Sequence, residues 1–563
     1  MMSSSIAEII SIGAVLPFIA MLTAPDKVFN HELIQPLVQF LGIVQPDELM
    51  LPLTVIFCSG TVLAGAMRIL LLYSNTRLSY AAGADLSIDI YRRTLYQSYS
   101  VHVKRNSSEV INAIIVKTGV LIRDTLMPIL TIVSSLMILC AISFSLLFID
   151  PYIALAAFGS FGVIYGCIVF ITRQRLKKNS ISVAKQSDLT MKSLQEGLGG
   201  VRDILLDASQ ETFCKMFRHA DLALRKAQGS NLIMAGSPRY AMEAVGMILI
   251  SVLAYSMAKK PGGAVEALPI LGALALSAQR LLPVLQQIYA SITSIKGSQA
   301  SLQDTLAMLD QKMQPSTVTS PLDFKRKIHI NNMSFRYDDN TPWVVKNLSL
   351  QIPRGKKFGF IGTTGSGKST LLDIVMGLLE PTEGELLIDG VAVNNANARG
   401  WHAHIAHVPQ TVFLADSSIA ENIAFGCPKN KIDLDRVKEA ASQAQISEVI
   451  ESLPEKYDTF VGERGVRLSG GQRQRIGIAR ALYKDADVLI FDEATSALDT
   501  ETENAVMQTI DALSNEFTIL IIAHRLSTLR CCNQIVELKN GNISAIGSYE
   551  GLIGQNNDLV AVT

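Results

Sequence analysis

Six long apolar stretches limit what this chain can fold into more than any other feature of its sequence. They lie near residues 6–24, 52–73, 127–148, 151–171, 240–258 and 265–290. Crossing the hydrocarbon core of a bilayer takes about 20 helical residues, and each stretch is about that long. The sequence therefore predicts a six-span membrane protein. The first stretch contains Glu8 and Pro17 and could instead be a signal peptide, although it lacks a basic n-region.

Positive charges in the connecting segments predict the orientation. The segments 74–126 and 172–239 carry nineteen Lys and Arg residues between them, whereas the three connections on the other side carry only Lys27, Lys259 and Lys260. Because Lys and Arg concentrate in cytoplasmic connections, we expect an inner-membrane protein with both long segments, the N-terminus and the chain after residue 290 in the cytoplasm. Apolar residues recur at helical spacing in both segments. This predicts long helices that bend near 98–108 and 207–212, with two small cytosolic inserts as the alternative.

Composition excludes several other classes of protein. Hydrophobic residues make up 49% of the chain and charged residues 18%, which excludes a disordered chain. The formal net charge is zero, so no overall basic field attracts nucleic acid, and we expect no nucleic-acid partner. The seven cysteines show no C-x-x-C or metal-binding spacing, as expected of a reduced, cytosol-facing protein.

A polar linker at 311–325 separates the predicted transmembrane domain, 1–310, from a soluble domain, 326–563, in which strand, turn and helix follow one another. The predicted strand 357–362 leads into a loop of the form G-x-x-x-x-G-K-[ST], and a helix is predicted at 370–379. Backbone N–H groups of such a loop point at a polyphosphate, its lysine reaches the β- and γ-phosphates, and its serine holds Mg²⁺. The loop therefore predicts a nucleotide bound with Mg²⁺, and the residues expected to bind it are Gly362, Thr363, Thr364, Gly365, Ser366, Gly367, Lys368, Ser369 and Thr370.

Two carboxylates follow the apolar strand 488–491. Ligands of α/β sheets bind at the carboxyl ends of the strands. We therefore expect Asp492 to complete the Mg²⁺ shell with Ser369, and Glu493 to polarise or deprotonate the attacking water. A solvated acidic strand end is the alternative.

Between these motifs lies Leu468-Ser469-Gly470-Gly471-Gln472, and with it the soluble domain resembles the ATP-binding cassette (ABC) superfamily. The resemblance implies that Gln410 senses Mg²⁺ and water, that His524 contacts the γ-phosphate, and that Tyr337 stacks on adenine. An exposed strand aromatic is the alternative for Tyr337. In this family the signature turn, Ser469, Gly470, Gly471 and Gln472, binds ATP held by a second subunit, so the resemblance also implies a dimer.

Two further matches are typical of exporters. Val461-Gly462-Glu463-Arg464-Gly465 resembles the short X-loop of exporter-type ABC proteins, and six spans ahead of a cassette match the same architecture (type IV). The expected fold is thus an α-helical six-span transmembrane bundle of the ABC exporter type, followed by an α/β P-loop NTPase cassette. The resemblance implies a half-transporter that works as a homodimer, hydrolyses ATP to drive transport and uses the two predicted bends as coupling helices.

Ionisable residues inside predicted spans are costly, so each is a candidate for substrate binding. Arg280 lies well inside the sixth predicted span. Arg68 could instead snorkel to the headgroups, and Arg239 could pair with Glu243 one turn later.

The membrane half also resembles bacterial flippases of lipid-linked oligosaccharides that serve protein N-glycosylation. The matching residues are Glu8, Pro17-Phe18-Ile19, Arg68, Pro238-Arg239, Glu243, Arg280-Leu281 and Pro283. This resemblance implies an amphipathic, lipid-linked saccharide as the cargo. A multidrug or lipid-A-type exporter shares every strong motif and is the first alternative, and a soluble ABC ATPase, which would lack the six spans, is a distant one.

A histidine cluster, H-x-H-x-x-H, comprises His402, His404 and His407. In a strand, His402 and His404 would share a face and His407 would point away. No nearby cysteine or carboxylate completes a metal shell, so we expect a polar strand approaching Gln410. Adjacent Cys531 and Cys532 rarely suit disulfide geometry and are expected to be inert.

Overall fold

The computed structural model divides the chain into two compact units. The helical unit comprises Met1–Tyr96 and Arg105–Lys312, and the cassette unit comprises Gln97–Lys104 and Met313–Thr563. The described residues are 25–30, 34–149, 151–258, 263–311, 313, 322–494, 500–512, 517–523 and 526–553, together with Ser3, Ile6, Ala7, Phe18 and Met21.

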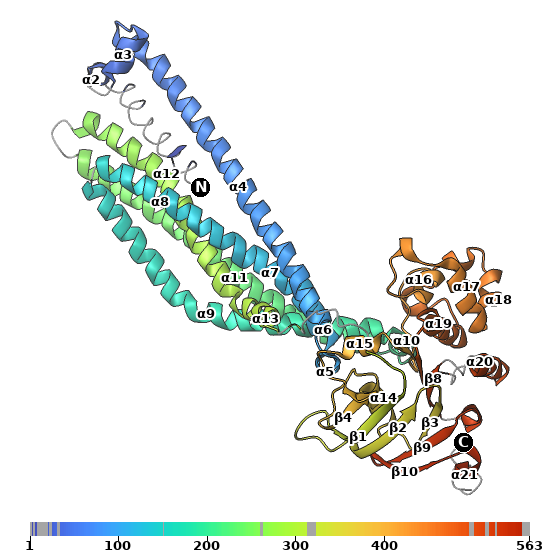
Figure 1. Ribbon diagram of the computed structural model, residues 1–563. Coiled ribbons are helices and arrows are strands. Elements are labelled where there is room, and N and C mark those ends of the chain that lie inside the picture. Colours follow the sequence, from blue (N-terminus) through green and yellow to red (C-terminus); the bar gives the residue numbers. More distant parts are fainter. Residues whose placement is uncertain are drawn as a thin grey trace. The chain divides into compact units, whose positions relative to one another are not determined.

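Within the described residues, five long helices dominate the helical unit (Figure 1): α4 (Met50–Leu95), α8 (Met127–Ile149), α9 (Pro151–Gly199), α11 (Gln210–Ala258) and α12 (Gly263–Gly297). Helix α9 packs against α11, α11 against α12, and α12 against α8. At about 1.5 Å per residue, the 46 residues of α4 reach about 69 Å. That length is more than twice the hydrocarbon core of a bilayer, which is about 30 Å thick.

Shorter elements complete this unit. They are α2 (Pro25–Phe29), α3 (Gln35–Leu41), η1 (Pro46–Leu49), α6 (Ser107–Asn112), η2 (Ala113–Lys117), α7 (Thr118–Leu121), η3 (Ile122–Leu126), α10 (Val201–Leu206) and α13 (Gln299–Leu309). Both η2 and η3 are π-helical turns. The chain bends between α10 and α11, within the range predicted near 207–212. The other predicted bend contains α5 (Tyr99–Lys104), which clusters with the cassette unit.

The long helices coincide with most of the predicted spans. Within the described residues, Pro46–Leu95 and Ser107–Phe144 are long and apolar enough to cross a membrane. The stretches predicted at 151–171, 240–258 and 265–290 fall in α9, α11 and α12. The stretch predicted at 6–24, with Glu8 and Pro17, lies largely outside the described residues.

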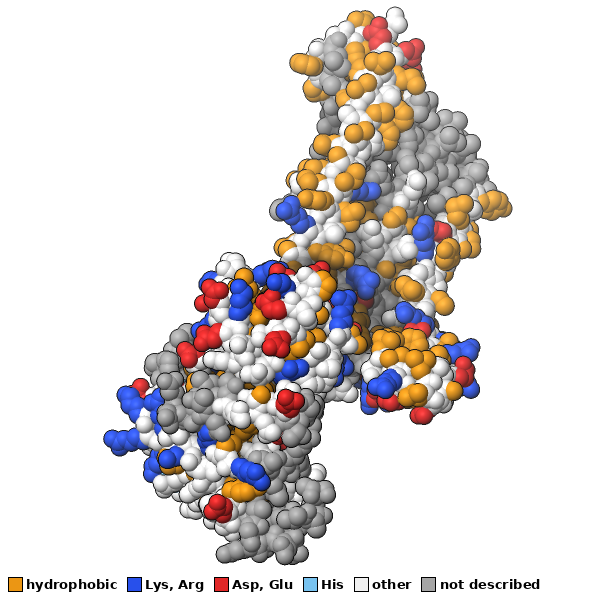
Figure 2. All heavy atoms as spheres, turned by 90° about the vertical axis from the view of Figure 1, so that its right-hand side faces the viewer, with side chains coloured by type: hydrophobic (Ala, Val, Ile, Leu, Met, Phe, Trp, Pro, Cys, Tyr) orange, Lys and Arg blue, Asp and Glu red, His pale blue; other side chains and the backbone are white. Residues whose placement is uncertain are grey.

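Apolar side chains face outwards over much of the helical unit. Figure 2 shows hydrophobic side chains crowding its visible surface, and Leu72 of α4, for example, is 63% exposed. Small polar residues are prominent among its buried positions, including Ser79, Thr94, Ser108, Thr118, Ser180, Ser301 and Thr305. Membrane helices turn apolar side chains towards lipid and pack small and polar residues against one another, and this unit follows that pattern.

Two sheets organise the cassette unit (Figure 1). The smaller is antiparallel, with strand order β2-β1-β4-β5. In the larger, ordered β10-β9-β3-β8-β7-β6, all pairs are parallel except β10 with β9. The strands are β1 (Lys327–Phe335), β2 (Val345–Pro353), β3 (Lys357–Ile361), β4 (Glu383–Ile388), β5 (Val391–Ala392), β6 (Ile405–Val408), β7 (Val488–Asp492), β8 (Thr518–Ile522), β9 (Gln534–Lys539) and β10 (Asn542–Gly547).

The larger sheet is buried on both faces. On β7, Val488 and Ile490 pack into one hydrophobic core, which includes Trp401, whereas Leu489 and Phe491 pack into a second core. Successive side chains of a strand point to opposite faces. A strand covered on both sides therefore needs an uninterrupted apolar run, which is why β7 reads Val-Leu-Ile-Phe before its terminal aspartate.

The helix after the phosphate loop differs from the prediction of 370–379. Helix α14 begins at Lys368 and ends at Val375. Gly367 caps its start in the left-handed conformation (φ 97°), and Gly377 (φ 71°) turns the chain beyond its end. The other cassette helices are α15 (Ala398–His402), α16 (Ile419–Ile423), α17 (Leu434–Gln443), α18 (Ser447–Ser452), α19 (Gly470–Tyr483), α20 (Thr500–Ala512) and α21 (Tyr549–Ile553), with single turns η4 (Lys429–Lys431), η5 (Lys456–Asp458), η6 (Glu463–Gly465) and η7 (Leu526–Leu529).

Candidate functional site

The parallel strands of the larger sheet gather the predicted nucleotide residues at one edge of the cassette. Strand β3 leads into the phosphate loop, β6 leads to Gln410, and β7 leads to Asp492 and Glu493. Since the carboxyl ends of parallel strands meet at the same edge, residues far apart in the sequence come together there. His524, which follows β8, lies outside the described residues.

Two glycines of the phosphate loop have conformations and surroundings that no other residue would fit. Gly362 has φ 147°, and a Cβ atom there would meet the carbonyl oxygen of Leu538 at 2.2 Å. Gly367 has φ 97°, and its Cβ would meet the carbonyl oxygen of Val344 at 2.8 Å. The loop thus passes close to neighbouring backbone and opens directly into the N-terminus of α14, where free N–H groups favour an anion.

Lys368 folds across this loop. Its Nζ donates to the carbonyl oxygens of Gly362 at 2.7 Å and Thr363 at 3.0 Å. Burial lowers the pKa of Lys368, and the negative charges of Glu493 and Asp492 partly oppose that shift. The hydroxyl of Ser366 is buried and has no hydrogen-bond partner among the described residues. Glycine backbone, an ammonium group and an unpaired buried hydroxyl form a donor set that fits a polyphosphate.

Glu493 and Gln410 meet beside the end of β7. The Nε2 group of Gln410 donates to Oε2 of Glu493 at 2.6 Å. Glu493 has φ 50°, in the left-handed region that a residue with a Cβ rarely adopts, and its N–H donates to Ile522 at 3.0 Å. Strained backbone of this kind clusters at functional sites. A fixed carboxylate next to an amide can orient and accept a proton from water.

Tyr337 lies beside the start of α14. Its hydroxyl is 3.2 Å from that of Thr370, its ring packs edge-to-face on Phe335, and it is 37% exposed. The ring is partly exposed, and its stacking on adenine stays a prediction. Tyr99 of α5 is a neighbour of Tyr337 that the sequence did not predict. Burial raises the pKa of Tyr99, and the nearby Asp373 and Tyr337 raise it further. No spacing rule relates Tyr99 to Tyr337.

The same segment contributes an ion pair that the sequence did not reveal. Lys104 of α5 pairs with Asp338, the residue that follows Tyr337. Both charged groups are partly exposed. The segment Gln97–Lys104 therefore contacts the cassette unit at the residues around the aromatic ring.

The signature turn begins helix α19. Ser469 is the N-cap: its Oγ accepts from the N–H of Gln472 at 3.2 Å, and Oε1 of Gln472 accepts from the N–H of Ser469 at 2.9 Å. This reciprocal cap orients the first turn, which includes Gly470 and Gly471. The N-terminus of a 14-residue helix attracts anions through its free N–H groups and its dipole.

The candidate substrate arginines occupy different settings. Arg239 pairs with Glu243 at 2.7 Å, which confirms the pairing proposed from their spacing. The pair lines a cavity of about 100 Å³ with Tyr165 of α9 and Gln286 of α12. Arg68 is exposed on α4. The backbone of Arg280 lies in α12, but its side chain lies outside the described part of the structure.

A larger cavity in the helical unit, whose mainly apolar lining also contains charged and amide groups, was not predicted. It measures about 430 Å³ and includes Arg123, Asp124, Arg225, Gln228, Asn231 and Ser294 in its lining. These residues come from η3, α11 and α12. These residues share a cavity only because their helices pack together, and no short sequence pattern connects them.

The histidine cluster requires two corrections. His402 is the last residue of α15, not part of a strand, because that helix buries Trp401, whose Nε1 donates to Val375 at 2.8 Å. A carboxylate does lie nearby, since Nδ1 of His404 contacts Asp487, which is distant in sequence. His407 is partly buried on β6, and this burial lowers its pKa to about 4. Among the described residues, no group of three or more suitable side chains could hold a metal ion.

Comparisons with known proteins agree with this arrangement. Residues 5–259 match the family model of the ABC transporter transmembrane region, and residues 345–496 match that of the ABC transporter cassette. A solved structure of a bacterial Atm1-family ABC exporter with ATP bound superimposes with a TM-score of 0.81 at 22% identity, covering 99% of this chain and 96% of that one.

Relatives named ATP-dependent lipid A-core flippase match this chain over different shares of its length. The Chromohalobacter salexigens protein is 33% identical over 70% of this chain and 68% of its own length. The Methylococcus capsulatus protein is 28% identical over 98% of this chain and 89% of its own length. The Cupriavidus metallidurans protein is 41% identical, but the match spans 44% of this chain and 42% of that protein. The chain therefore belongs to the ABC transporter family, with a transmembrane region and an ATP-binding cassette joined in one chain of the exporter fold.

Proposed function

We propose that this chain is one half of an ATP-driven flippase that moves a phosphorylated, saccharide-bearing lipid across the inner membrane. The observation that carries the proposal is the match along 98% of the chain to a lipid A-core flippase, since it includes the transmembrane region as well as the cassette. The positive charge of the segments 74–126 and 172–239 supports a cytoplasmic cassette.

In the proposed reaction the phosphate loop and Lys368 bind the polyphosphate of ATP, and Tyr337 stacks on its adenine. Asp492, Ser369 and Gln410 would hold Mg²⁺, which neutralises charge on the phosphates. Glu493 accepts a proton from, or orients, the attacking water, and its short contact with Gln410 fixes its carboxylate. The role of His524 at the γ-phosphate rests on the resemblance alone.

We infer that two copies of the chain form the working transporter. The signature turn presents a capped helix N-terminus that suits a phosphate, and in this family such a turn completes the ATP site of the second subunit. ATP would then stabilise the closed pair only by its stronger binding to that state. Hydrolysis removes the γ-phosphate bridge and lets the pair open.

An anionic lipid is the cargo that the helical unit fits best. Carrying a phosphate group through the hydrocarbon core unassisted is costly, and charge-assisted bonds from arginine offset that cost. Arg123 and Arg225 line the larger cavity and Arg239 the smaller one. Arg239 pairs with Glu243 and Arg225 pairs with Asp221, and Asp124 lines the larger cavity beside Arg123. A phosphate group would therefore compete with a carboxylate for arginine in either cavity.

Reconstitution in liposomes tests this function. ATP-dependent flipping would be compared for lipid A, a polyprenyl-pyrophosphate saccharide and a plain phospholipid of the same vesicles. We expect flipping of at least one phosphorylated saccharide lipid well above that of the phospholipid. Hydrophobic drugs that stimulate ATP hydrolysis, with no response to either saccharide lipid, would instead establish the multidrug exporter as the function.

A further inference from the structure

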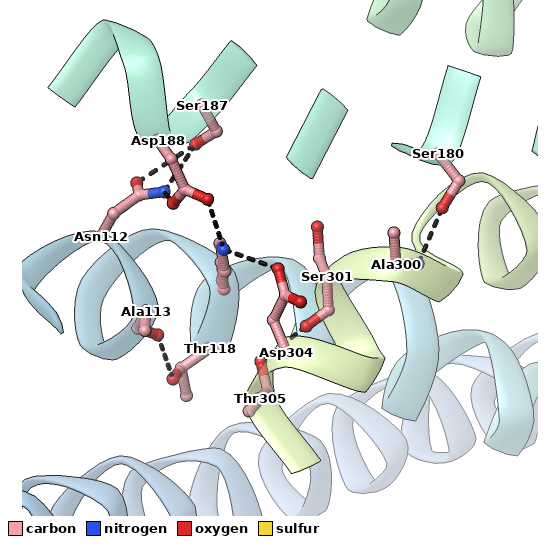
Figure 3. Close-up of polar contacts among 11 residues, drawn as sticks. Asn112, Ala113, Thr118, Ser180, Ser187, Asp188, Ala300, Ser301, Asp304 and Thr305 are labelled. Carbon is pink, nitrogen blue, oxygen red and sulfur yellow. Dashed lines mark hydrogen bonds and ion pairs between the residues drawn. The ribbon is translucent and has the colours of Figure 1, made fainter. Parts of the chain in front are cut away.

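Helix α13 is the last helix of the helical unit, and from it the chain continues towards the cassette. A buried break at Ser298 separates α13 from α12. A helix begins with N–H groups that have no partner inside the helix, and here the N–H of Ala300 donates to Oγ of Ser180 on α9 at 2.8 Å (Figure 3). Helix α9 thus holds the start of α13.

A buried lysine holds the middle of α13. Lys117, the last residue of η2, has a side chain that is 7% exposed, and its Nζ pairs with Asp188 of α9 at 2.9 Å and with Asp304 of α13 at 2.6 Å. Figure 3 shows the two carboxylates approaching one nitrogen atom from different helices. Asp188 also accepts from Nδ2 of Asn112 at 2.8 Å. One ammonium group therefore links three segments that are far apart in the sequence.

A third contact holds the end of α13. The last carbonyl groups of a helix have no partner within it. Arg93 of α4 donates from Nη1 to the carbonyl oxygen of Leu309 at 2.6 Å and to that of Gln311 at 3.3 Å, while its Nε pairs with Asp89 at 2.8 Å. The helix that precedes the cassette is therefore attached at its start, middle and end, each time by polar groups of another helix.

The polar character of these contacts requires an explanation. Burying the ammonium group of Lys117 is costly, although the side chains of Asp188 and Asp304 stay 29% and 46% exposed. An apolar residue of similar size often stabilises a protein equally well or better. Buried polar groups can instead fix one register of packing, since each needs its own partner. Lys117 stands at the end of a π-helical turn, and such turns are frequent at functional sites. Leucine side chains in place of Lys117, Asp188 and Asp304 would pack in more than one register along α13. The ion pairs fix a single register.

We propose that Lys117 is a positioning residue for energy coupling: with Asp188 and Asp304 it fixes α13 to α9 and η2, so that movements of the cassette reach the transmembrane helices. The proposal rests on ATP-driven transport as the function of the chain. Loss of the contact is expected to uncouple hydrolysis from transport. It is not expected to abolish ATP hydrolysis, because none of these residues belongs to the nucleotide site.

The test uses the full-length protein in lipid nanodiscs and liposomes. A triple variant, Lys117→Met with Asp188→Asn and Asp304→Asn, removes all three charges and so leaves none unpaired. Asp304→Asn alone retains the Lys117–Asp188 pair and serves as a milder variant. The matched control is Lys192→Met with Glu196→Gln, which removes an exposed pair from the same helix α9.

Two measurements are made for each variant. The first is the amount of lipid A or polyprenyl-pyrophosphate saccharide flipped per ATP hydrolysed, which we expect to fall about 5- to 150-fold in the triple variant, the usual range of coupling between two sites. The second is the change that ATP causes in the hydrogen exchange of η2, α9 and α13. The hydrogen-exchange measurement requires no cargo. It therefore tests the role of Lys117 even if the proposed lipid is not the substrate.

We expect the triple variant to hydrolyse ATP at a rate close to that of the unmodified protein, while ATP no longer alters exchange in α9. Asp304→Asn should show a smaller change in the same direction, and the control should show none. Unchanged coupling in the triple variant would overturn the proposal. So would an equal loss of hydrolysis and transport, or an equal effect of the control, because either would indicate a general effect on folding or charge.

Discussion

The two units of this chain bury opposite kinds of side chain. In the cassette, large apolar residues such as Trp401, Phe358 and Ile330 are fully buried. In the helical unit, apolar residues such as Leu72 are exposed, and the buried set includes hydroxyl groups and Lys117. Burial away from water stabilises the first arrangement, whereas in lipid an apolar side chain gains little by moving inwards. A charged side chain is therefore expected to have a different role in each of the two units.

In the cassette, the carboxylates of Asp492 and Glu493 stand at the open edge of a sheet whose interior is apolar. In the helical unit, Asp188 and Asp304 are paired between helices. The comparison suggests that a charge in the cassette edge serves chemistry, and that a charge between the helices serves their placement.

The largest effect is expected from Glu493→Gln, which removes the carboxylate and retains its shape. We expect ATP binding to persist while hydrolysis slows by about 10²–10⁴-fold, the usual contribution of a positioned general base. Binding is measured by nucleotide titration and hydrolysis by phosphate release, with Glu455→Gln as the exposed control. Near-normal turnover in the Glu493 variant would remove this residue from its assigned role.

The next largest effect concerns stability. Ile330 is fully buried in the core of the cassette, and Ile330→Ala should lower the free energy of unfolding of the cassette by about 2–5 kcal/mol, through lost burial and the cavity that remains. Thermal unfolding followed by tryptophan fluorescence measures this, because Trp401 lies in the same core. A change below about 1 kcal/mol would mean that this core relaxes freely, contrary to the close packing of protein interiors.

Much of the nucleotide site could be predicted because its signals are local. The phosphate loop needs glycines at fixed spacing, and Gly362 and Gly367 have the backbone conformations that explain them. The continuous apolar run of β7 predicted a buried strand that ends at Asp492. The pair of Arg239 and Glu243 follows from helical spacing and was confirmed.

The remaining contacts could not be predicted because they join residues that no local rule relates. Lys117 and Asp304 are 187 positions apart, and the contact of His404 with Asp487 spans 83. Tyr99 lies near Tyr337 because of the tertiary fold, and no sequence pattern relates the two residues. The prediction of a helix at 370–379 was wrong at both boundaries, because glycine conformation rather than apolar periodicity sets where this helix begins and ends.

A smaller effect is expected from the pH dependence of Asp373 on α14. Burial, followed by the charge of Asp492, raises its pKa from 3.8 to about 6. The folded state therefore binds this proton more tightly than the unfolded state, so the contribution of Asp373 to stability declines as the pH rises from about 4 to about 6. Asp373→Asn should remove that decline and, at pH 7.5, raise the free energy of unfolding by about 1–2 kcal/mol, less than the full shift implies because solvent screens this partly exposed group.

The measurement for Asp373 is the melting midpoint of both proteins at pH 5 and pH 7.5. We expect the variant to be the more stable protein at the higher pH, with the difference narrowing at the lower one. A difference that widens at low pH would show that Asp373 is stabilised in its charged form, which contradicts the burial seen here.

The smallest effect is expected from Leu72→Ala on α4, a truncation of the same kind as Ile330→Ala but at an exposed position. If Leu72 faces lipid, its surroundings change little on unfolding within the membrane, so stability should change by no more than about 0.5 kcal/mol, as at most surface sites. The measurement is thermal unfolding in nanodiscs beside Ile330→Ala. A loss as large as that of Ile330→Ala would contradict a lipid-facing position, because it would require Leu72 to pack against another protein surface, and a second copy of the chain is the partner that the proposed dimer supplies.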